Sequence, residues 1–167
     1  MAKLPEYPLK TLQEIKERKK KETEDHWVEC KKAREKEELK LKEMEEELRR
    51  MIERREMKRR EYADKAMRGE HNGQLAQAAQ VFIERLKEEE ALQRDRIENQ
   101  KTTVEEKKVV EKEAMDAMVA ATQDVKALEK HKEKWAEQIK RELQIKEEEA
   151  LDDLAQSIFE RQKNDPG

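Results

Sequence analysis

The sequence predicts an all-α protein, a long two-helix antiparallel coiled-coil hairpin with the second helix overhanging the start of the first. Three observations support this fold class: a very polar composition, a scarcity of helix breakers, and apolar residues that recur at steps of three and four. Charged residues make up 49% of the 167 residues and apolar residues 34%. A globular domain carries closer to half apolar residues, so this chain can bury only a narrow contact between helices.

Glycine and proline are confined to the two ends and one central segment. They occur at Pro5, Pro8, Gly69, Gly73, Pro166 and Gly167. The rest of the chain is dominated by Glu, Lys, Arg, Ala, Leu, Gln and Met, which are strong helix formers, whereas disordered chains are enriched in Pro, Gly and Ser. Helix is therefore favoured over disorder.

These breakers divide one elongated domain, residues 1–167, into five segments. The segments are an extended lead-in (1–8), a first helix (9–68), a turn (69–73), a second helix (74–162) and a frayed tail (163–167). We expect Gly69, Gly73 and Asn72 to supply the positive φ angles that end one helix and reverse the chain.

Both predicted helices carry an apolar stripe. In the first helix, Leu41, Met44, Leu48 and Met51 form a strict a/d heptad pattern. Less regular positions extend it: Leu9, Leu12, Ile15, Trp27, Cys30, Ala33 and Tyr62. The stripe of the second helix consists of Leu75, Ala79, Phe82, Leu86, Ile97, Val104, Met118, Val125, Leu128, Trp135, Ile139, Leu143, Leu151, Leu154 and Ile158.

Folding the chain at residue 71 brings most apolar positions opposite one another, with facing residue numbers that sum to roughly 142. The predicted contacts are Met67 with Leu75, Tyr62 with Ala79, Met44 with Ile97, Trp27 with Met115 and Met118, Ile15 with Leu128, and Tyr7 and Leu9 with Trp135. The second helix then extends past the chain start by roughly 30 residues, or about 45 Å. Its apolar stripe continues there uncovered, which predicts that another protein, another copy or a bound helix covers it.

The sequence offers little catalytic, cofactor or metal chemistry. None of His26, His71 and His131 follows a Glu by three residues, as di-iron bundles require. His26 and Cys30 are spaced by four residues, as in half of a metal site, but no second half is visible, so we expect Cys30 to pack in the helix contact. No nucleotide-binding loop or nucleophile elbow occurs, and we predict no enzyme activity, no cofactor and no metal.

Charge and hydropathy limit the partners. The formal net charge is −3, which disfavours nucleic acid as a partner. There is no signal peptide and no apolar run near 18 residues, so we expect no membrane insertion. The single Cys30 fits a reducing cytoplasm.

Three clusters of residues each allow a structural and a functional interpretation. The basic run Arg18 to Lys21 is either a solvated surface or a contact with an acidic partner. The acidic residues Glu147 to Glu149 with Asp152 and Asp153 are either solvated or part of a docking surface. The apolar group near the turn closes the hairpin end, forms a binding tip, or does both; its members are Leu75, Ala79, Phe82 and Leu86.

Four features resemble a known family. The chain opens with Tyr7-Pro8-Leu9 and a charged helix from Lys10 to Lys16, and a glycine-containing turn lies near residue 70. The segment from Leu128 to Trp135 reads LEKHKEKW, and an acidic stretch precedes the end. Together they resemble the central-stalk proteins of type III secretion, the YscO/FliJ-like family, and favour its injectisome branch.

The resemblance implies a cytoplasmic, non-enzymatic stalk at the base of a bacterial secretion apparatus. It would be a monomer alone, would couple the hexameric secretion ATPase to the cytoplasmic ring of the export gate, and would aid secretion chaperones. The end that meets the ATPase would comprise Arg18, Lys19, Lys20, Lys21, Trp135, Ile139, Leu143, Leu151, Leu154 and Ile158. The end that meets the export gate would comprise Tyr62, Ala66, Leu75, Ala79, Phe82 and Leu86.

The main alternative is a generic coiled-coil scaffold or adaptor that oligomerises through its C-terminal overhang. A prefoldin-like chaperone arm would need strands near the hairpin, and no segment alternates with a period of two. Oligomeric state distinguishes the stalk from the scaffold or adaptor, because a stalk should be monomeric alone.

Overall fold

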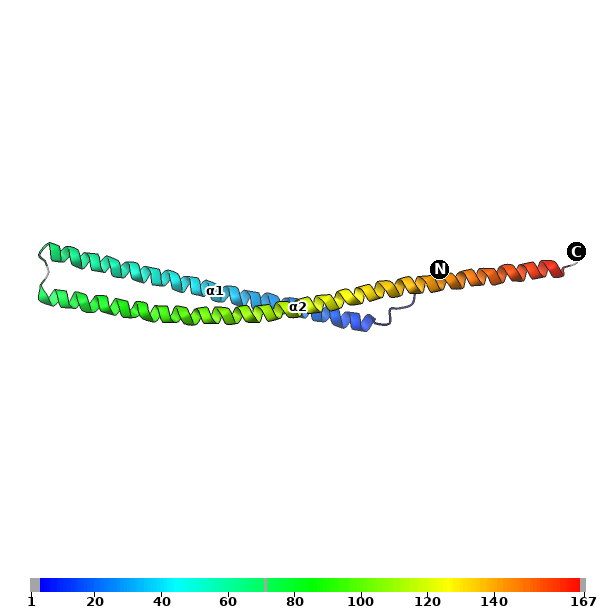
Figure 1. The fold of residues 1–167 in the computed structure, drawn as a ribbon, viewed down its shortest axis with the longest axis horizontal. Helices are drawn as coiled ribbons and strands as arrows, with labels where there is room; N and C mark the ends of the chain where they lie inside the picture. The colour runs from blue at the N-terminus through cyan, green and yellow to red at the C-terminus, as the bar shows by residue number, and fades with distance from the viewer. Residues whose placement is uncertain (1–3, 71, 166–167) are drawn as a thin grey trace. The chain divides into compact units, whose positions relative to one another are not determined.

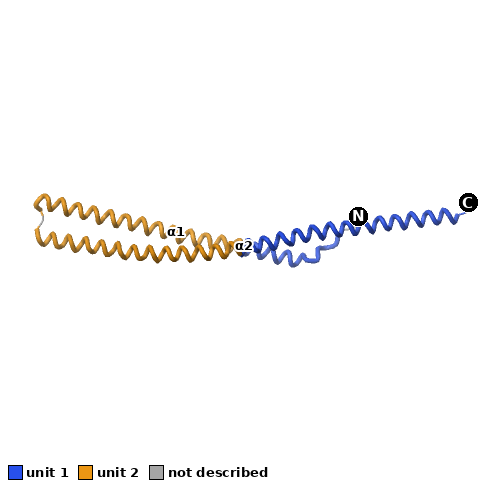
Figure 2. Tube along the Cα trace, in the orientation of Figure 1, with its two compact units in different colours: residues 1–23, 117–167 blue, residues 24–116 orange. Residues whose placement is uncertain are grey.

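The structure, a computed structural model, describes residues 4–70 and 72–165. It consists of two long helices, α1 (Lys10–Met67) and α2 (Gly73–Asn164), and no strand occurs within the described ranges (Figure 1). The helices pack against each other in opposite directions, which confirms the predicted all-α hairpin. The chain divides into two compact units, residues 24–116 and residues 1–23 with 117–167 (Figure 2).

The first helix begins where the lead-in ends. Residues 4–7 are not helical, and Pro8 and Leu9 form a turn. The Leu9 carbonyl accepts a hydrogen bond from the Gln13 amide at 2.8 Å, so Leu9 caps α1. The predicted lead-in also included residues 1–3, which lie outside the described residues.

The C-terminus of α1 is closed by a Schellman motif. The Gly69 amide donates to the Ala66 carbonyl at 3.2 Å and the Glu70 amide donates to the Lys65 carbonyl at 3.1 Å. Gly69 has a φ of 72°, the left-handed conformation that this motif requires. The prediction of a glycine-driven helix end is therefore confirmed at Gly69.

Asn72 and Gly73 have a different role from the one predicted. Gly69 is the single described residue with a positive φ angle, so the expected positive φ at Asn72 and Gly73 is wrong. The Asn72 side-chain oxygen instead accepts a hydrogen bond from the Leu75 amide at 2.9 Å, and α2 begins at Gly73. Asn72 is thus an N-cap, because its short amide side chain satisfies an otherwise free N–H of the first turn. His71, in the middle of the predicted turn, is outside the described residues.

A continuous heptad organises the contact between the helices. In α1 every a and d position from Gln13 to Tyr62 is buried or half-buried, including the predicted Leu41, Met44 and Leu48. In α2 every a and d position from Ala79 to Leu128 is buried or half-buried. The buried positions of α2 are Ala79, Leu86, Glu90, Gln93, Ile97, Gln100, Val104, Ala114, Ala121 and Val125. We call this row of positions the seam.

The predicted register is confirmed in both units. In one unit, Arg55 bonds Glu90 and Tyr62 packs edge to face against Phe82. In the other, Lys16 pairs with Asp124 at 3.2 Å, and the Tyr7 ring contacts the Trp135 ring. In each pair the residue numbers sum to within a few of the predicted value of roughly 142.

Two predicted apolar positions near the start of α1 are wrong. Leu12 is 38% and Ile15 is 53% exposed, so Ile15 points to solvent and away from the expected contact with Leu128. Counting heptads back from Leu41 places Lys16 on the seam instead, and its aliphatic stem is half-buried there. The helix keeps its heptad phase even where the apolar residues depart from it.

Other predicted contacts fail for the same reason. Met67 is 88% exposed and Leu75 52%, because neither lies at an a or d position, so they do not pack together as expected. Met115 is 47% exposed, and the adjacent Ala114 occupies the seam in its place.

Candidate protein-binding surfaces

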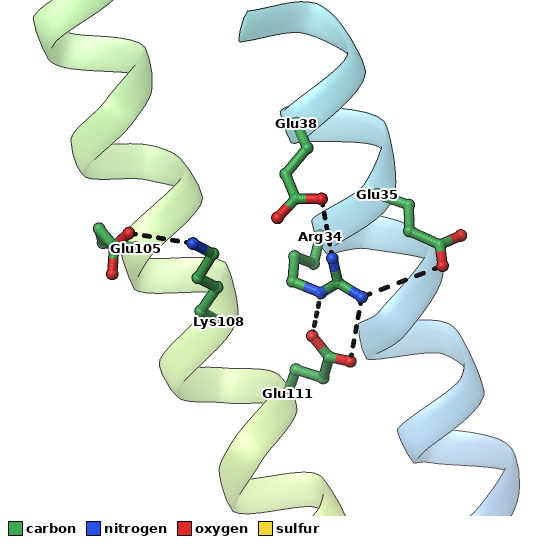
Figure 3. Close-up of polar contacts among 6 residues, drawn as sticks. All are labelled: Arg34, Glu35, Glu38, Glu105, Lys108 and Glu111. Atoms are coloured by element: carbon green, nitrogen blue, oxygen red, sulfur yellow. Dashed lines mark hydrogen bonds and ion pairs between the residues drawn. The ribbon is translucent and has the colours of Figure 1, made fainter. Parts of the chain in front are cut away.

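Two ion pairs join seam positions of α1 to seam positions of α2 within residues 24–116 of the described chain. At the first, the Arg34 guanidinium bonds Glu111 of α2 and also pairs with Glu38 at 2.8 Å (Figure 3). The Arg34 and Glu111 side chains are only 20% and 18% exposed. The hydrogen bonds from Arg34 to Glu111 and then to Glu38 raise the pKa of the guanidinium.

The second ion pair is more deeply buried. Arg55 Nε donates to Glu90 Oε2 at 2.7 Å, and the Glu90 side chain is 2% exposed. Arg55 also contacts Glu56 at 3.2 Å. The other carboxylate oxygen of Glu90, Oε1, has no hydrogen-bond partner within the described part of the chain.

The two ion pairs share one register. Arg34 and Arg55 are three heptads apart in α1, and Glu90 and Glu111 are three heptads apart in α2. Both pairs therefore form in the same alignment of the two helices. A buried polar residue that is satisfied in one alignment is a known means of fixing the register of a coiled coil.

Two buried glutamines support the same alignment. Gln93 donates to the Met44 carbonyl at 3.1 Å, and Gln100 donates to the Glu37 carbonyl at 3.0 Å and to its carboxylate at 2.6 Å. These polar seam positions do not belong to the apolar stripe that the sequence predicts. The heptad count from Ala79 and Leu86 was the signal that could have found them.

No group of three or more His, Cys, Asp or Glu side chains within residues 4–70 and 72–165 is placed to bind a metal. Cys30 Sγ lies 3.6 Å from His26 Nε2, and Cys30 is buried in the seam. The residue that the sequence placed in the helix contact is therefore found there.

The end with both termini combines a packed part and an exposed part. Tyr7 is 5% exposed; its ring packs edge-on against Trp135 at 5.3 Å between centroids, and its hydroxyl lies 2.5 Å from His131 Nδ1. Trp135, Ile139 and Leu143 are half-buried. The other apolar residues predicted to meet the ATPase are exposed, with Leu151 at 64%, Leu154 at 58% and Ile158 at 48%. Phe159, which the sequence reading omitted, is 66% exposed beside them.

The four residues of the basic run, Arg18 to Lys21, differ in exposure because they lie on different sides of the helix. Arg18, Lys19 and Lys21 are exposed, whereas Lys20 is half-buried at a seam position. Three of the four predicted basic residues are therefore open to a partner, and the fourth helps to form the hairpin.

Two of the residues predicted to meet the export gate are buried in the contact between the helices. Ala79 and Leu86 are 8% and 6% exposed because they lie on the seam and face α1, so they close the hairpin and cannot meet a partner there. Tyr62 and Phe82 are half-buried with their rings 6.5 Å apart, edge to face. Ala66 and Leu75 are exposed.

The outer side of α2 near the turn carries a shallow groove that the sequence reading missed. It is lined by Gln74, Gln77, Ala78, Val81, Phe82 and Arg85. Val81 is 60% exposed within it. Residues spaced by three and four that lie off the seam were the signal that could have found it.

Neither helix, over its described residues, has a segment apolar and long enough to cross a membrane.

No curated protein matches the sequence significantly. The chain is similar to CT670 of Chlamydia trachomatis, a solved structure described as that of a YscO homologue. The two share 20% sequence identity, with a TM-score of 0.84 over 96% of this chain and 98% of that one, so the fold is the same. The model of the YscO-like protein family matches residues 4–165, and the chain therefore belongs to the YscO-like family.

Proposed function

We propose that this protein is the non-enzymatic stalk of a bacterial type III secretion system, coupling the hexameric secretion ATPase to the cytoplasmic ring of the export gate. The YscO-like family is a family of type III secretion components rather than of enzymes. On this proposal the protein works in the cytoplasm at the base of the apparatus, aids export and interacts with secretion chaperones.

The observation that carries the proposal is a hairpin of fixed register whose second helix continues beyond the first. Four polar layers hold α1 and α2 in one alignment. α2 has 92 residues against 58 in α1, and Leu151, Leu154 and Ile158 remain exposed near its end. A protein that transmits force between two machines needs a fixed alignment of its helices and a surface for each machine.

The exposed residues at each end suggest one surface for the ATPase and one for the export gate. The ATPase would meet the basic residues Arg18, Lys19 and Lys21 and the exposed apolar residues of the α2 end. The export gate would meet the outer side of the other end, where Ala66, Leu75 and Val81 are exposed.

Sizing with light scattering tests the proposal, first on the protein alone and then with purified secretion ATPase from the same source. We expect a monomer that joins the ATPase at one copy per hexamer. A stable homodimer that does not bind the ATPase would refute the stalk and favour an adaptor that oligomerises through its C-terminal overhang. The exposed Leu151, Leu154 and Ile158 are the observation that supports this second function.

A further inference from the structure

The last part of α2 has a charge distribution unlike the rest of the chain. Residues 147–160 contain six acidic side chains and no basic one, whereas the whole chain has a net charge of only −3. The remainder of the protein is therefore net basic. We call residues 147–160 the acidic segment.

The acidic segment is also amphipathic. At about 100° per residue, Leu151, Leu154 and Ile158 lie within roughly 60° of one another around the helix axis. Each is about half to two-thirds exposed. Five acidic residues lie on the side of the helix away from the stripe, and they are Glu148, Glu149, Asp152, Asp153 and Glu160. Glu147 lies in line with the stripe, one turn before Leu151.

Charge decides which partner can cover this stripe. A second copy in the same position would bring six carboxylates against six others, and like charges at an interface are strongly unfavourable. An anionic membrane surface would be repelled for the same reason. A protein groove with an apolar floor and a rim of lysine and arginine matches both the stripe and the charge.

We infer that the acidic segment docks into a basic-rimmed apolar groove of a partner protein. The inference rests on the proposed function, which assigns that groove to the secretion ATPase. It goes further in separating two contacts: an acidic one through residues 147–160 and a basic one through the run at Arg18 to Lys21.

Equilibrium binding to purified ATPase from the same source, measured at low and at physiological salt, tests the inference. One variant neutralises the segment with E148Q, E149Q, D152N and D153N. A matched control makes the same change in net charge at exposed positions of residues 24–116, with E88Q, E106Q, D95N and D116N. Circular dichroism establishes that both remain helical.

We expect the segment variant to lose about tenfold in affinity and most of its salt dependence, and the control to bind like the wild type. A second pair of variants tests the apolar floor. L154Q with I158Q should lose about tenfold, and L39Q with L92Q, which are also exposed, should lose little.

Three results would overturn the inference. If both neutralised proteins weaken equally, net charge and not this segment matters. If neither weakens while wild type binds, the stalk proposal stands and the docking of this segment is wrong. A wild-type homodimer that L154Q with I158Q abolishes would identify a second copy as the occupant, and a wild type that fails to bind the ATPase would refute the proposed function itself.

Discussion

Arg55 Nε donates a hydrogen bond to Glu90 Oε2 over 2.7 Å, inside the contact between the two helices. Glu90 is 1% exposed and one of its carboxylate oxygens has no partner in the described chain. Burying such a pair costs desolvation that its attraction barely repays, so it adds little to stability. Its value lies in the alignment that it permits.

The first prediction concerns the unequal cost of removing each partner. R55L should destabilise the hairpin by about 3 kcal/mol, because it leaves a buried carboxylate without its cation. E90L should cost less, since Arg55 is 16% exposed and keeps Glu56 at 3.2 Å. The double variant should be as stable as the wild type or more stable. Urea denaturation followed by circular dichroism measures all three.

An exposed arginine provides the control. Arg49 is 65% exposed and pairs with Glu46 and Glu53, so R49L should change the stability by less than about 0.5 kcal/mol. Equal losses for R55L and E90L would contradict this account of the buried pair.

The alignment of the helices is protected against sliding by one heptad. A slide in one direction would place Ile97 beside Arg55 in the position of Glu90, and a slide in the other would place Ile83 there. Either slide leaves a buried guanidinium against an aliphatic side chain, without a counter-charge.

The apolar positions of the seam also disfavour both slides. The slide that brings Ile97 beside Arg55 also brings Glu111 beside Leu41, and the opposite slide brings Glu90 beside Leu48. The ionic positions therefore act against the two nearest alternative alignments as well as in favour of the native one.

The second prediction is that apolar replacement of both ion pairs permits sliding. The test protein carries R34L, R55L, E90L and E111L. Spin labels at L39C and E106C, both exposed sites, in a C30A background report the distance between the helices by pulsed electron paramagnetic resonance. We expect one narrow distance in the parent and an additional population in the test protein, because a heptad slide moves the helices by about 10 Å. One unchanged distance in both would show that the remaining layers and the connection between the helices are enough to fix the alignment.

The third prediction contrasts the two glycines near the turn. Gly69 has a φ of 72°, so G69A should cost about 1 kcal/mol although no heavy atom beyond its two chain neighbours lies within 4 Å of the added methyl group. Gly73 is helical with equally open space, so G73A should stabilise by about 0.5 kcal/mol. Thermal unfolding of the two variants measures this difference, and equal effects would contradict the assigned roles.

Most of the fold follows from the sequence because breakers and helix formers are so clearly separated. The heptad at Leu41 to Met51 and the glycine at residue 69 are local signals, and both lead to what the structure contains. The seam itself was only partly predictable. Glu90 and Gln93 are buried because the helix phase carries them inward, whereas Ile15 is exposed because the same phase carries it outward. Composition shows which residues favour burial, but the heptad phase of the helix decides which residues are buried.

The surfaces near the ends were harder to predict for the same reason. Ala79 and Leu86 are apolar like Leu75 and Val81, and only the heptad phase separates the buried pair from the exposed pair. A list of apolar residues near the turn cannot distinguish a side chain that closes the hairpin from one that remains open to a partner.

The final prediction concerns the attachment of the lead-in by Tyr7. Tyr7 is 5% exposed, and its ring packs on Trp135 and has Lys132 Nζ 5.9 Å from its centre. In a W27F background, Y7A should expose Trp135, shift its fluorescence to the red and release residues 4–9, at a local cost of about 2 kcal/mol. Y7F keeps the ring and loses only the hydrogen bond to His131, so it should cost about 1 kcal/mol or less. Hydrogen exchange of the amides of Lys10 and Gln13, which bond the carbonyls of Tyr7 and Leu9, gives a second readout. If Y7A leaves both the emission and the exchange unchanged, the lead-in is held by contacts other than the tyrosine ring.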